Sequence, residues 1–342
     1  MTGVALPVPY ALFLGAGDQL SVKTATGIAY WRPDRCIAQV VLPGCSADLG
    51  LPTLSPAEAA KAGARVLVIG AAEFGGRIAP AWVPTLVAAL EAGLDLAAGL
   101  HERLAGIPQL ADAARRLGRT LHDVRQPHPS QLAIASGERR AGRRLLTVGT
   151  DCAVGKMFTS LAIEAELKKR GVEATFRASG QTGILISGAG VSVDAVVSDF
   201  VAGAAELLSP ANRPDHWDLI EGQGSLHHPA YAGVTLGLIH GSQPDALVLC
   251  HRIDLEHIDG YDKFPTPALA AAIAANEGAA HLTNPGARVV GISVNTSAAP
   301  AERARRYLAE LTATHGLPCC DPVRDGVASI VDRLLALHPR AA

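Results

Sequence analysis

Short apolar runs alternate along the chain with segments in which apolar residues recur every three or four positions. Runs of the first kind are typical of buried strands, and segments of the second kind are typical of helices that cover a sheet. Their alternation indicates a parallel α/β layer. In the first part of the chain the pattern predicts strands at Tyr10–Leu14, Ile37–Leu42, Arg65–Gly70, Leu94–Ala97 and Thr120–Val124, and helices at Ala81–Ala92 and Pro108–Leu117.

The alternation stops in residues 125–142. The segment RQPHPS carries two prolines there, and prolines interrupt both helices and strands. We therefore predict two domains, a Rossmann-like domain in residues 1–138 and a second domain in residues 139–342. Four arginines follow the prolines, which favours a solvated linker, with contact to a phosphate tail as the alternative. These are Arg139, Arg140, Arg143 and Arg144.

The second part of the chain resumes the α/β pattern. A strand at Leu145–Val148 runs into a glycine-bearing loop and then a helix, which is the arrangement of a phosphate-binding P-loop. The predicted fold class is therefore α/β, with an N-terminal Rossmann-like domain followed by a P-loop NTPase-like α/β domain. Further strands are predicted at Ala174–Ala178, Ala195–Ser198, Trp217–Glu221, Ala246–Cys250 and Arg288–Val294, and helices at Lys156–Arg170, Pro267–Asn276, Pro300–Thr314 and Ala328–Leu337.

Composition narrows the classes of partner. The net charge of −2 gives no electrostatic reason to expect nucleic acid, and no apolar stretch approaches the ~18–20 residues that span a membrane. The six cysteines form no CxxC pair, and the first residues lack the positive region of a signal peptide. We expect a cytoplasmic protein with reduced thiols and a small-molecule substrate, and a homo-oligomer on base rates alone.

The loop after Val148 is the strongest chemical signal. Backbone N–H groups at a helix N-terminus and a lysine ammonium can surround an anion there. The residue after the lysine is Met157, where a Mg²⁺-coordinating Ser or Thr normally stands, and Thr159 lies about 300° round the helix from the lysine. We predict that a cofactor is bound by Gly149, Thr150, Asp151, Cys152, Ala153, Val154, Gly155, Lys156 and Met157.

Loss of that hydroxyl changes the expected chemistry. Phosphoryl transfer relies on Mg²⁺ that is held partly by the missing group. A ligand whose phosphates only anchor it tolerates the loss. Coenzyme A is such a ligand, because its thioester reacts away from its phosphates.

Polar residues follow two more predicted strands, at the edge of the sheet that carries the phosphate loop. Arg177 is a candidate clamp for a substrate carboxylate, because its planar fork pairs two oxygens. The alternative is a glycine-rich turn whose polar side chains bond to its own backbone. The predicted substrate-binding residues are Arg177, Ser179, Gln181, Thr182, Gln223 and Ser225.

Candidates for a general base lie after the strand at Trp217–Glu221. Glu221 stands where P-loop proteins usually place a second acidic group, and His227 and His228 titrate near neutrality. We predict Glu221 and His228 as the catalytic pair of candidates, with structural histidines as the alternative. The spacing of the histidines fits no recognised metal-ligand pattern, so no metal site is predicted.

The chain resembles the bacterial D-glutamate N-acetyltransferase family over nearly its full length. The loop also resembles that of dethiobiotin synthetase, and Met157 matches the form of the transferase family. The resemblance rests on Lys23-Thr24-Ala25, Gly75-Gly76, Gly99-Leu100-His101, Asp123-Val124-Arg125, Gly149–Met157, Gly180-Gln181-Thr182-Gly183, Glu221-Gly222-Gln223-Gly224-Ser225 and His240-Gly241-Ser242-Gln243-Pro244-Asp245.

This resemblance implies transfer of an acetyl group from acetyl-CoA to the amino group of D-glutamate. It does not supply the catalytic residues. Two alternatives remain open at this point. One is an ATP- and Mg²⁺-dependent enzyme of dethiobiotin-synthetase type that phosphorylates a carboxylate, which Met157 disfavours. The other is a nucleotide- or CoA-binding protein without catalysis.

Overall fold

The chain folds into two compact units, each built on one parallel sheet. The structure, a computed structural model, describes residues 6–19, 21–71 and 76–339. One unit comprises residues 1–128 and 180–195, and the other comprises residues 129–179 and 196–342. The division differs from the one expected at residue 138, because residues 180–195 belong with the first unit rather than the second.

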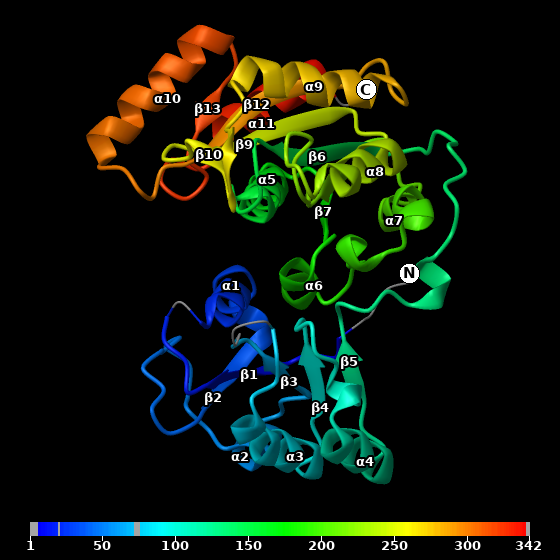
Figure 1. Ribbon diagram of the computed structural model, residues 1–342, viewed down its shortest axis with the longest axis vertical. Helices are drawn as coiled ribbons and strands as arrows, with labels where there is room; N and C mark the ends of the chain where they lie inside the picture. The colour runs from blue at the N-terminus through cyan, green and yellow to red at the C-terminus, as the bar shows by residue number, and fades with distance from the viewer. Residues whose placement is uncertain (1–5, 20, 72–75, 340–342) are drawn as a thin grey trace. The chain divides into compact units, whose positions relative to one another are not determined.

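The first unit has a five-stranded sheet in the order β2-β1-β3-β4-β5, with all neighbours parallel. Figure 1 shows α2, α3 and α4 along one face of this sheet and α1 and α6 along the other. Its elements are β1 (Tyr10–Gly15), α1 (Lys23–Trp31), η1 (Pro33–Arg35), β2 (Cys36–Val41), α2 (Pro56–Lys61), β3 (Val66–Ile69), η2 (Pro80–Trp82), α3 (Val83–Glu91), β4 (Asp95–Ala98), η3 (Leu104–Gly106), α4 (Pro108–Leu117), β5 (Leu121–Asp123), α6 (Gln181–Ser187) and η5 (Val193–Ala195).

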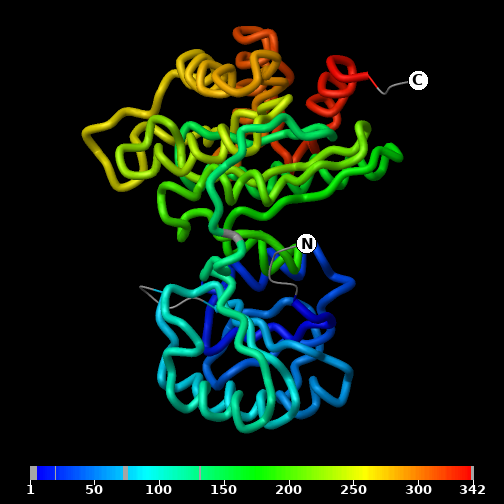
Figure 2. Tube along the Cα trace, turned by 90° about the vertical axis from the view of Figure 1, so that its right-hand side faces the viewer, coloured from blue at the N-terminus to red at the C-terminus, as the bar shows by residue number. Residues whose placement is uncertain are grey.

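Residues 180–195 join the first unit through packing and hydrogen bonds. Helix α6 packs against α1, and Figures 1 and 2 show the green segment beside the blue one. The Arg35 guanidinium donates to the Ser187 carbonyl oxygen at 2.7 Å, and the Leu6 N–H donates to the Gly188 carbonyl oxygen at 3.0 Å. These bonds satisfy carbonyls at the end of α6, which explains why the segment leaves the P-loop unit.

The second unit has a six-stranded parallel sheet in the order β13-β12-β9-β6-β8-β7. Helices α5 and α11 pack together on one face, and α8 and α9 pack on the other (Figure 1). Its elements are η4 (Pro129–Gln131), β6 (Arg143–Gly149), α5 (Lys156–Lys169), β7 (Ala174–Arg177), η6 (Ser198–Phe200), α7 (Val201–Leu208), β8 (Trp217–Ile220), α8 (Ala232–Ser242), β9 (Ala246–Arg252), β10 (His257–Ile258), β11 (Tyr261–Pro265), α9 (Leu269–His281), β12 (Arg288–Asn295), α10 (Ala301–His315), β13 (Cys319–Cys320) and α11 (Ala328–Leu337).

The predicted fold class is confirmed by these two sheets, but one predicted strand is wrong. Residues 195–198 lie between the 3-10 turns η5 and η6 and pair with no strand of the described residues. The apolar Val196 is buried there while Val197 is 62% exposed. The apolar run is therefore only half buried and forms no strand of either sheet.

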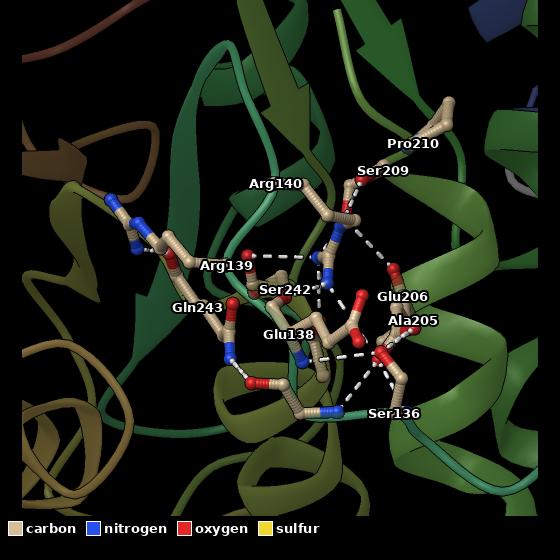
Figure 3. Close-up of polar contacts among 12 residues, drawn as sticks. Ser136, Glu138, Arg139, Arg140, Ala205, Glu206, Ser209, Pro210, Ser242 and Gln243 are labelled. Atoms are coloured by element: carbon tan, nitrogen blue, oxygen red, sulfur yellow. Dashed lines mark hydrogen bonds and ion pairs between the residues drawn. The ribbon is translucent and has the colours of Figure 1, made fainter.

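The arginines after the domain boundary are not a solvated linker, so that interpretation is wrong. Arg140 donates to the Ser209 carbonyl oxygen at 2.9 Å and to the Gly241 carbonyl oxygen at 2.8 Å (Figure 3). These oxygens lie at the C-terminal ends of α7 and α8, where carbonyl groups lack partners within the helix and a positive charge is favourable. Burial lowers the pKa of Arg140 to about 10.

Arg144 is fully buried and bonds to the same region. Its guanidinium donates to the carbonyl oxygens of Arg140 at 3.1 Å and Ala141 at 3.0 Å, and its backbone N–H donates to an Asp245 carboxylate oxygen at 2.8 Å. Burial lowers the pKa of this guanidinium as well. The arginine thus organises the turn that leads into β6.

We expect Arg144→Met to lower the free energy of unfolding by about 3 kcal/mol or more. The methionine fills much of the space but leaves several buried carbonyl oxygens without donors. Urea unfolding followed by circular dichroism measures the change. Lys169→Met, on the exposed end of α5, is the matched control. Equal midpoints for the two variants would contradict the role given to Arg144.

Candidate functional site

The candidate site lies at the carboxyl ends of β6, β8 and β9, which are neighbours in the second sheet. The loop from Gly149 turns sharply before α5 begins at Lys156. Ala153 and Gly155 both adopt positive φ, at +52° and +99°. Few side chains favour positive φ, so these two residues mark a tight turn that leads into the N-terminus of α5. This places the first N–H groups of α5 toward the edge of the sheet.

Lys156 is buried within this loop. Its ammonium donates to the Asp151 carbonyl oxygen at 2.7 Å, and burial lowers its pKa. Two glycines make room for the side chain. A Cβ added at Gly149 would lie 3.1 Å from Nζ, and one added at Gly222 would lie 3.0 Å from Cδ and 1.7 Å from the Thr147 carbonyl oxygen. The sequence therefore keeps these two positions free of side chains so that the lysine can reach the loop.

Glu221 directly follows β8 and is 5% exposed. Its Oε2 accepts the Ser179 N–H at 3.0 Å, and its backbone oxygen accepts the Ser179 hydroxyl at 2.6 Å. The Gln223 amide donates to the same Ser179 hydroxyl oxygen at 3.2 Å. Glu221 is also one of the charges that act on Lys156. A buried carboxylate is thus fixed beside the P-loop cation, in an orientation set by Ser179.

Asp151, Cys152 and His228 form a second cluster, in which one ligand atom of each lies within 4.8 Å of the others. Both Asp151 oxygens accept backbone N–H groups, from Cys152 at 2.6 Å and from Asp259 at 2.7 Å. Asp259 lies in the turn of the β10–β11 hairpin, so Asp151 ties that hairpin to the P-loop. These bonds fix the orientation of the Asp151 carboxylate.

His228 is buried and held in one orientation. Its Nδ1 accepts the Ala230 N–H at 3.0 Å, and its Nε2 lies 3.9 Å from Asp151 Oδ1. The rings of Tyr231 and Tyr261 pack around it, with ring centroids 4.4 and 5.2 Å away. An imidazole whose Nδ1 accepts a hydrogen bond carries its proton on Nε2. His228 therefore carries its proton on Nε2, which lies 3.9 Å from Asp151 Oδ1, and this arrangement does not support its predicted role as a base through Nε2.

His251, at the end of β9, contacts the first part of the P-loop. Its Nδ1 lies 3.0 Å from the Thr150 hydroxyl and its Nε2 lies 3.1 Å from the Tyr307 hydroxyl. Burial lowers the pKa of His251 to about 4. A neutral imidazole therefore positions Thr150, the second residue of the loop.

We expect His251 to make the folded protein less stable as the pH falls from about 6.5 to about 4. In that range the unfolded chain takes up the proton at the ordinary histidine pKa and the folded chain does not, so the loss reaches roughly 3 kcal/mol below pH 4. Unfolding free energies of the wild type and His251→Gln between pH 4 and 7 measure it. His257→Gln, an exposed histidine, is the control. Parallel pH curves for wild type and His251→Gln would contradict the expectation.

The structure shows why Thr159 does not replace the hydroxyl missing at Met157. The Thr159 side chain is buried, donates to the Gly155 carbonyl oxygen at 3.0 Å and lies 2.7 Å from the Ser293 hydroxyl of β12. Thr159 therefore joins α5 to β12, and both of its partners are groups of the protein itself. This geometry is consistent with the prediction that the Thr159 hydroxyl does not replace the metal-binding hydroxyl that is missing at Met157.

Arg177 is engaged by a buried carboxylate. Its Nε donates to Asp218 Oδ1 at 2.8 Å. Arg177 is in register with Ile220, so its partner lies two residues toward the amino end of β8. The side chain therefore extends back along the sheet, away from the end that carries Glu221. This placement does not support the predicted clamp for a substrate carboxylate.

The other predicted substrate residues separate into two groups. Ser179, Gln223 and Ser225 lie in the P-loop unit, where Ser225 is buried and its hydroxyl oxygen accepts the His227 N–H at 3.2 Å. Gln181 and Thr182 begin α6, in the first unit. Gly75, which carries part of the family resemblance, lies outside the described residues.

A cavity of about 330 Å³ adjoins the P-loop in the second unit, and sequence reasoning missed most of its lining. Val154, Phe158 and Val323 contribute apolar walls, while Asn295 and Arg324 contribute polar groups. Asp321, at the end of β13, organises the rim. Burial raises its pKa, but hydrogen bonds from Thr296 and from backbone N–H groups outweigh that effect and lower it. The sequence signal for this lining was weak: Asp321 is a polar residue directly after the short apolar run that forms β13.

Comparisons with known proteins agree with this architecture. A model described as the P-loop domain of DUF1611 matches residues 133–331, and one described as its Rossmann-like domain matches residues 40–127. A D-glutamate N-acetyltransferase of Tritonibacter scottomollicae is 52% identical over 97% of this chain and 100% of its own. A D-glutamate N-acetyltransferase of a Pseudoalteromonas species is 48% identical, over 95% of this chain and 98% of its own.

A solved structure supports the fold of the whole chain. The crystal structure of a DUF1611 family protein from Anabaena variabilis matches with a TM-score of 0.82 and 36% sequence identity. The match covers 96% of this chain and 100% of that one. The same pair of domains is therefore present in both proteins.

Proposed function

The chain belongs to the DUF1611 family, and we propose that it is a D-glutamate N-acetyltransferase that uses acetyl-CoA. Two relatives at 48% and 52% identity over nearly the full length are named D-glutamate N-acetyltransferase, and acetyl-CoA as the donor is part of our proposal. The observation that carries the proposal in this chain is a complete phosphate cradle, with Lys156 buried in it, followed by Met157 instead of a metal-binding hydroxyl.

The P-loop unit suits a donor that is anchored by its phosphates. Lys156 and the first N–H groups of α5 would hold a pyrophosphate, and the adjoining cavity of about 330 Å³ offers Phe158 and Val323 to a purine ring. Arg324 borders this cavity and also a second hollow that contains Arg305. Coenzyme A carries a further phosphate on its ribose, which Arg305 and Arg324 could pair, although Asp321 and Asp325 also line these two hollows. Bound acetyl-CoA would supply an activated acetyl group.

Glu221 is the candidate that suits the role of general base. The amino group of the acceptor must lose a proton before it can attack an acyl carbon, and a carboxylate within hydrogen-bond reach of that amino group can accept the proton. Ser179 orients Glu221 through its backbone N–H, which donates to Oε2, and through its hydroxyl, which donates to the Glu221 backbone oxygen. His228 would act as a positioning residue, because its donor atom faces Asp151 of the loop.

An ATP-dependent reaction is the second candidate function, and the P-loop itself is the feature in its favour. The missing hydroxyl at Met157 and the inward orientation of Thr159 both weigh against it. A cytoplasmic setting is part of the proposal, supported by the six free cysteines. Among the described residues, no helix is long and apolar enough to cross a membrane.

The test is an end-point assay by mass spectrometry with purified protein, acetyl-CoA and either D- or L-glutamate, without ATP. We expect N-acetyl-D-glutamate to accumulate and the L-isomer to react far less. Absence of product from both isomers, with folded protein that binds coenzyme A, would reject the proposed acceptor.

A further inference from the structure

The first unit has a cavity of its own, of about 240 Å³, at the carboxyl ends of the neighbouring strands β3, β4 and β5. Ile69 ends β3, Gly99 follows β4, and Arg125 lies just beyond β5; all three line the cavity. In open parallel sheets, ligands bind outside the carboxyl ends of the strands. The cavity therefore occupies the position where this type of sheet binds a small molecule, and the proposed donor site in the other unit does not use it.

The described residues that line this cavity include one cation and no carboxylate. The cation is Arg125, whose ion-pair partner Asp194 is not among the lining residues, and the His101 imidazole adds a hydrogen-bonding group. Thr24, in the first turn of α1, also lines it, and the N-terminus of that helix contributes partial positive charge. Such a lining favours an anion, and Thr24 and Gln181 add neutral hydrogen-bonding groups.

Gln181 is held over the cavity by close packing. A Cβ added at Gly99 would lie only 2.8 Å from the Gln181 Cβ, so the side chain rests directly on the strand end. Gly180 alone separates Gln181 from Ser179, the residue that orients Glu221. Helix α6, which begins at Gln181, thus forms part of the cavity wall.

Arg125 is fixed from one side only by a described partner. One terminal nitrogen of its guanidinium lies 2.5 Å from Asp194 Oδ2, and its side chain remains 18% exposed. The other Asp194 oxygen accepts the Ser192 hydroxyl at 2.7 Å. A guanidinium presents several N–H groups in a planar fork, so an arginine held by one nitrogen is preorganised to pair a carboxylate with another.

We propose that this cavity binds the acceptor through its carboxylates and that Arg125 is the residue that recognises them. The inference rests on the proposed function, since D-glutamate is a small amino acid with two carboxylates. The volume of about 240 Å³ suits a ligand of that size and lies below the range typical of sites for larger cofactors. The site would also take a dicarboxylate without an amino group, such as glutarate.

Initial-rate kinetics of Arg125→Gln test the proposal. We expect KM for D-glutamate to rise about tenfold or more, because a charge-assisted pair is lost, while KM for acetyl-CoA changes less than about twofold. Glutarate should inhibit the wild type competitively against D-glutamate. Arg115→Gln, an arginine that is 78% exposed in the same unit, is the matched control. An unchanged KM for D-glutamate in Arg125→Gln would overturn the proposal.

Asp194→Asn separates binding from folding. If Arg125 serves only to hold residues 180–195 in place, removal of its partner should raise KM for D-glutamate as much as Arg125→Gln does. If Arg125 binds the acceptor, Asp194→Asn should raise that KM less than Arg125→Gln does, because the charged guanidinium remains and only its orientation is less fixed. Equal increases in the two variants would therefore reject the binding role.

The proposal can also fail independently of the proposed function. If the wild type makes no N-acetyl-D-glutamate, calorimetric titration of D-glutamate and of glutarate into the full-length protein still tests the cavity. Binding that is lost in Arg125→Gln and kept in Arg115→Gln would support the site and leave the reaction open. No binding of either dicarboxylate to the wild type would overturn the site.

Discussion

Replacing Glu221 by glutamine is expected to lower kcat for acetyl transfer by about 10²–10⁴-fold, with KM for both substrates changed less than about threefold. Glutamine keeps the shape of the side chain and can still accept the Ser179 N–H that Oε2 accepts at 3.0 Å. It cannot take the proton of the substrate ammonium. The loss should therefore appear in kcat, as expected for a group needed in the transition state rather than in binding.

Two other variants serve as a control and a comparison for Glu221→Gln. Glu310→Gln, on the exposed surface of α10, controls for the removal of a carboxylate from the second unit. His228→Gln should cause a smaller loss than Glu221→Gln, because His228 already carries a proton on Nε2 and Glu221 is the group proposed to accept one. Near-normal kcat in Glu221→Gln would show that the base is another group, and a larger loss in His228→Gln would return the role to the histidine.

Replacing Lys156 by methionine is the second change with a large expected effect. KM for acetyl-CoA should rise about 10–100-fold, because a charged hydrogen bond to the donor phosphates is lost. The same variant should be at least as stable as the wild type. Burial lowers the pKa of Lys156, so the folded protein bears the cost of a desolvated ammonium that methionine does not carry.

This pair of effects distinguishes binding from folding. Donor titrations measure the first, and urea unfolding at pH 7 measures the second, with Lys169→Met at the far end of α5 as the control. A sharp loss of stability in Lys156→Met would show that the lysine mainly supports the loop through its bond to the Asp151 carbonyl oxygen. Unchanged KM for acetyl-CoA would remove the P-loop from donor binding.

The sequence predicted the elements whose signals are local. Buried strands such as β6 and β9 are continuous apolar runs in the sequence. The P-loop was predicted from glycines and a lysine between a strand and a helix. Helices α1, α7 and α8 were not predicted. Gly237 and Gly241 allow α8 to approach α7, since a Cβ at Gly241 would lie 1.9 Å from the Ala202 carbonyl oxygen. Small residues that pack two helices this closely leave little periodic pattern to detect.

The failures at the site came from long-range partners. Arg177 was given a role in binding, but its ion pair with Asp218 joins residues 41 positions apart. Arg140 reaches the ends of two helices through contacts with Ser209 and Gly241 that span 69 and 101 positions. The tautomer of His228 depends on the Ala230 N–H, two residues away but oriented only by the folded turn. In each case the residue type indicated what kind of bond the side chain can form, but only the fold determined which partner it bonds to.

The central claim is that this P-loop anchors an acyl donor and does not transfer a phosphoryl group. The most direct test is a single reaction with D-glutamate, acetyl-CoA, ATP and Mg²⁺, in which free coenzyme A, N-acetyl-D-glutamate and ADP are measured together. We predict equal amounts of coenzyme A and N-acetyl-D-glutamate, no ADP above background, and the same rate when EDTA replaces Mg²⁺. Release of ADP in proportion to product, abolished by EDTA, would contradict the account.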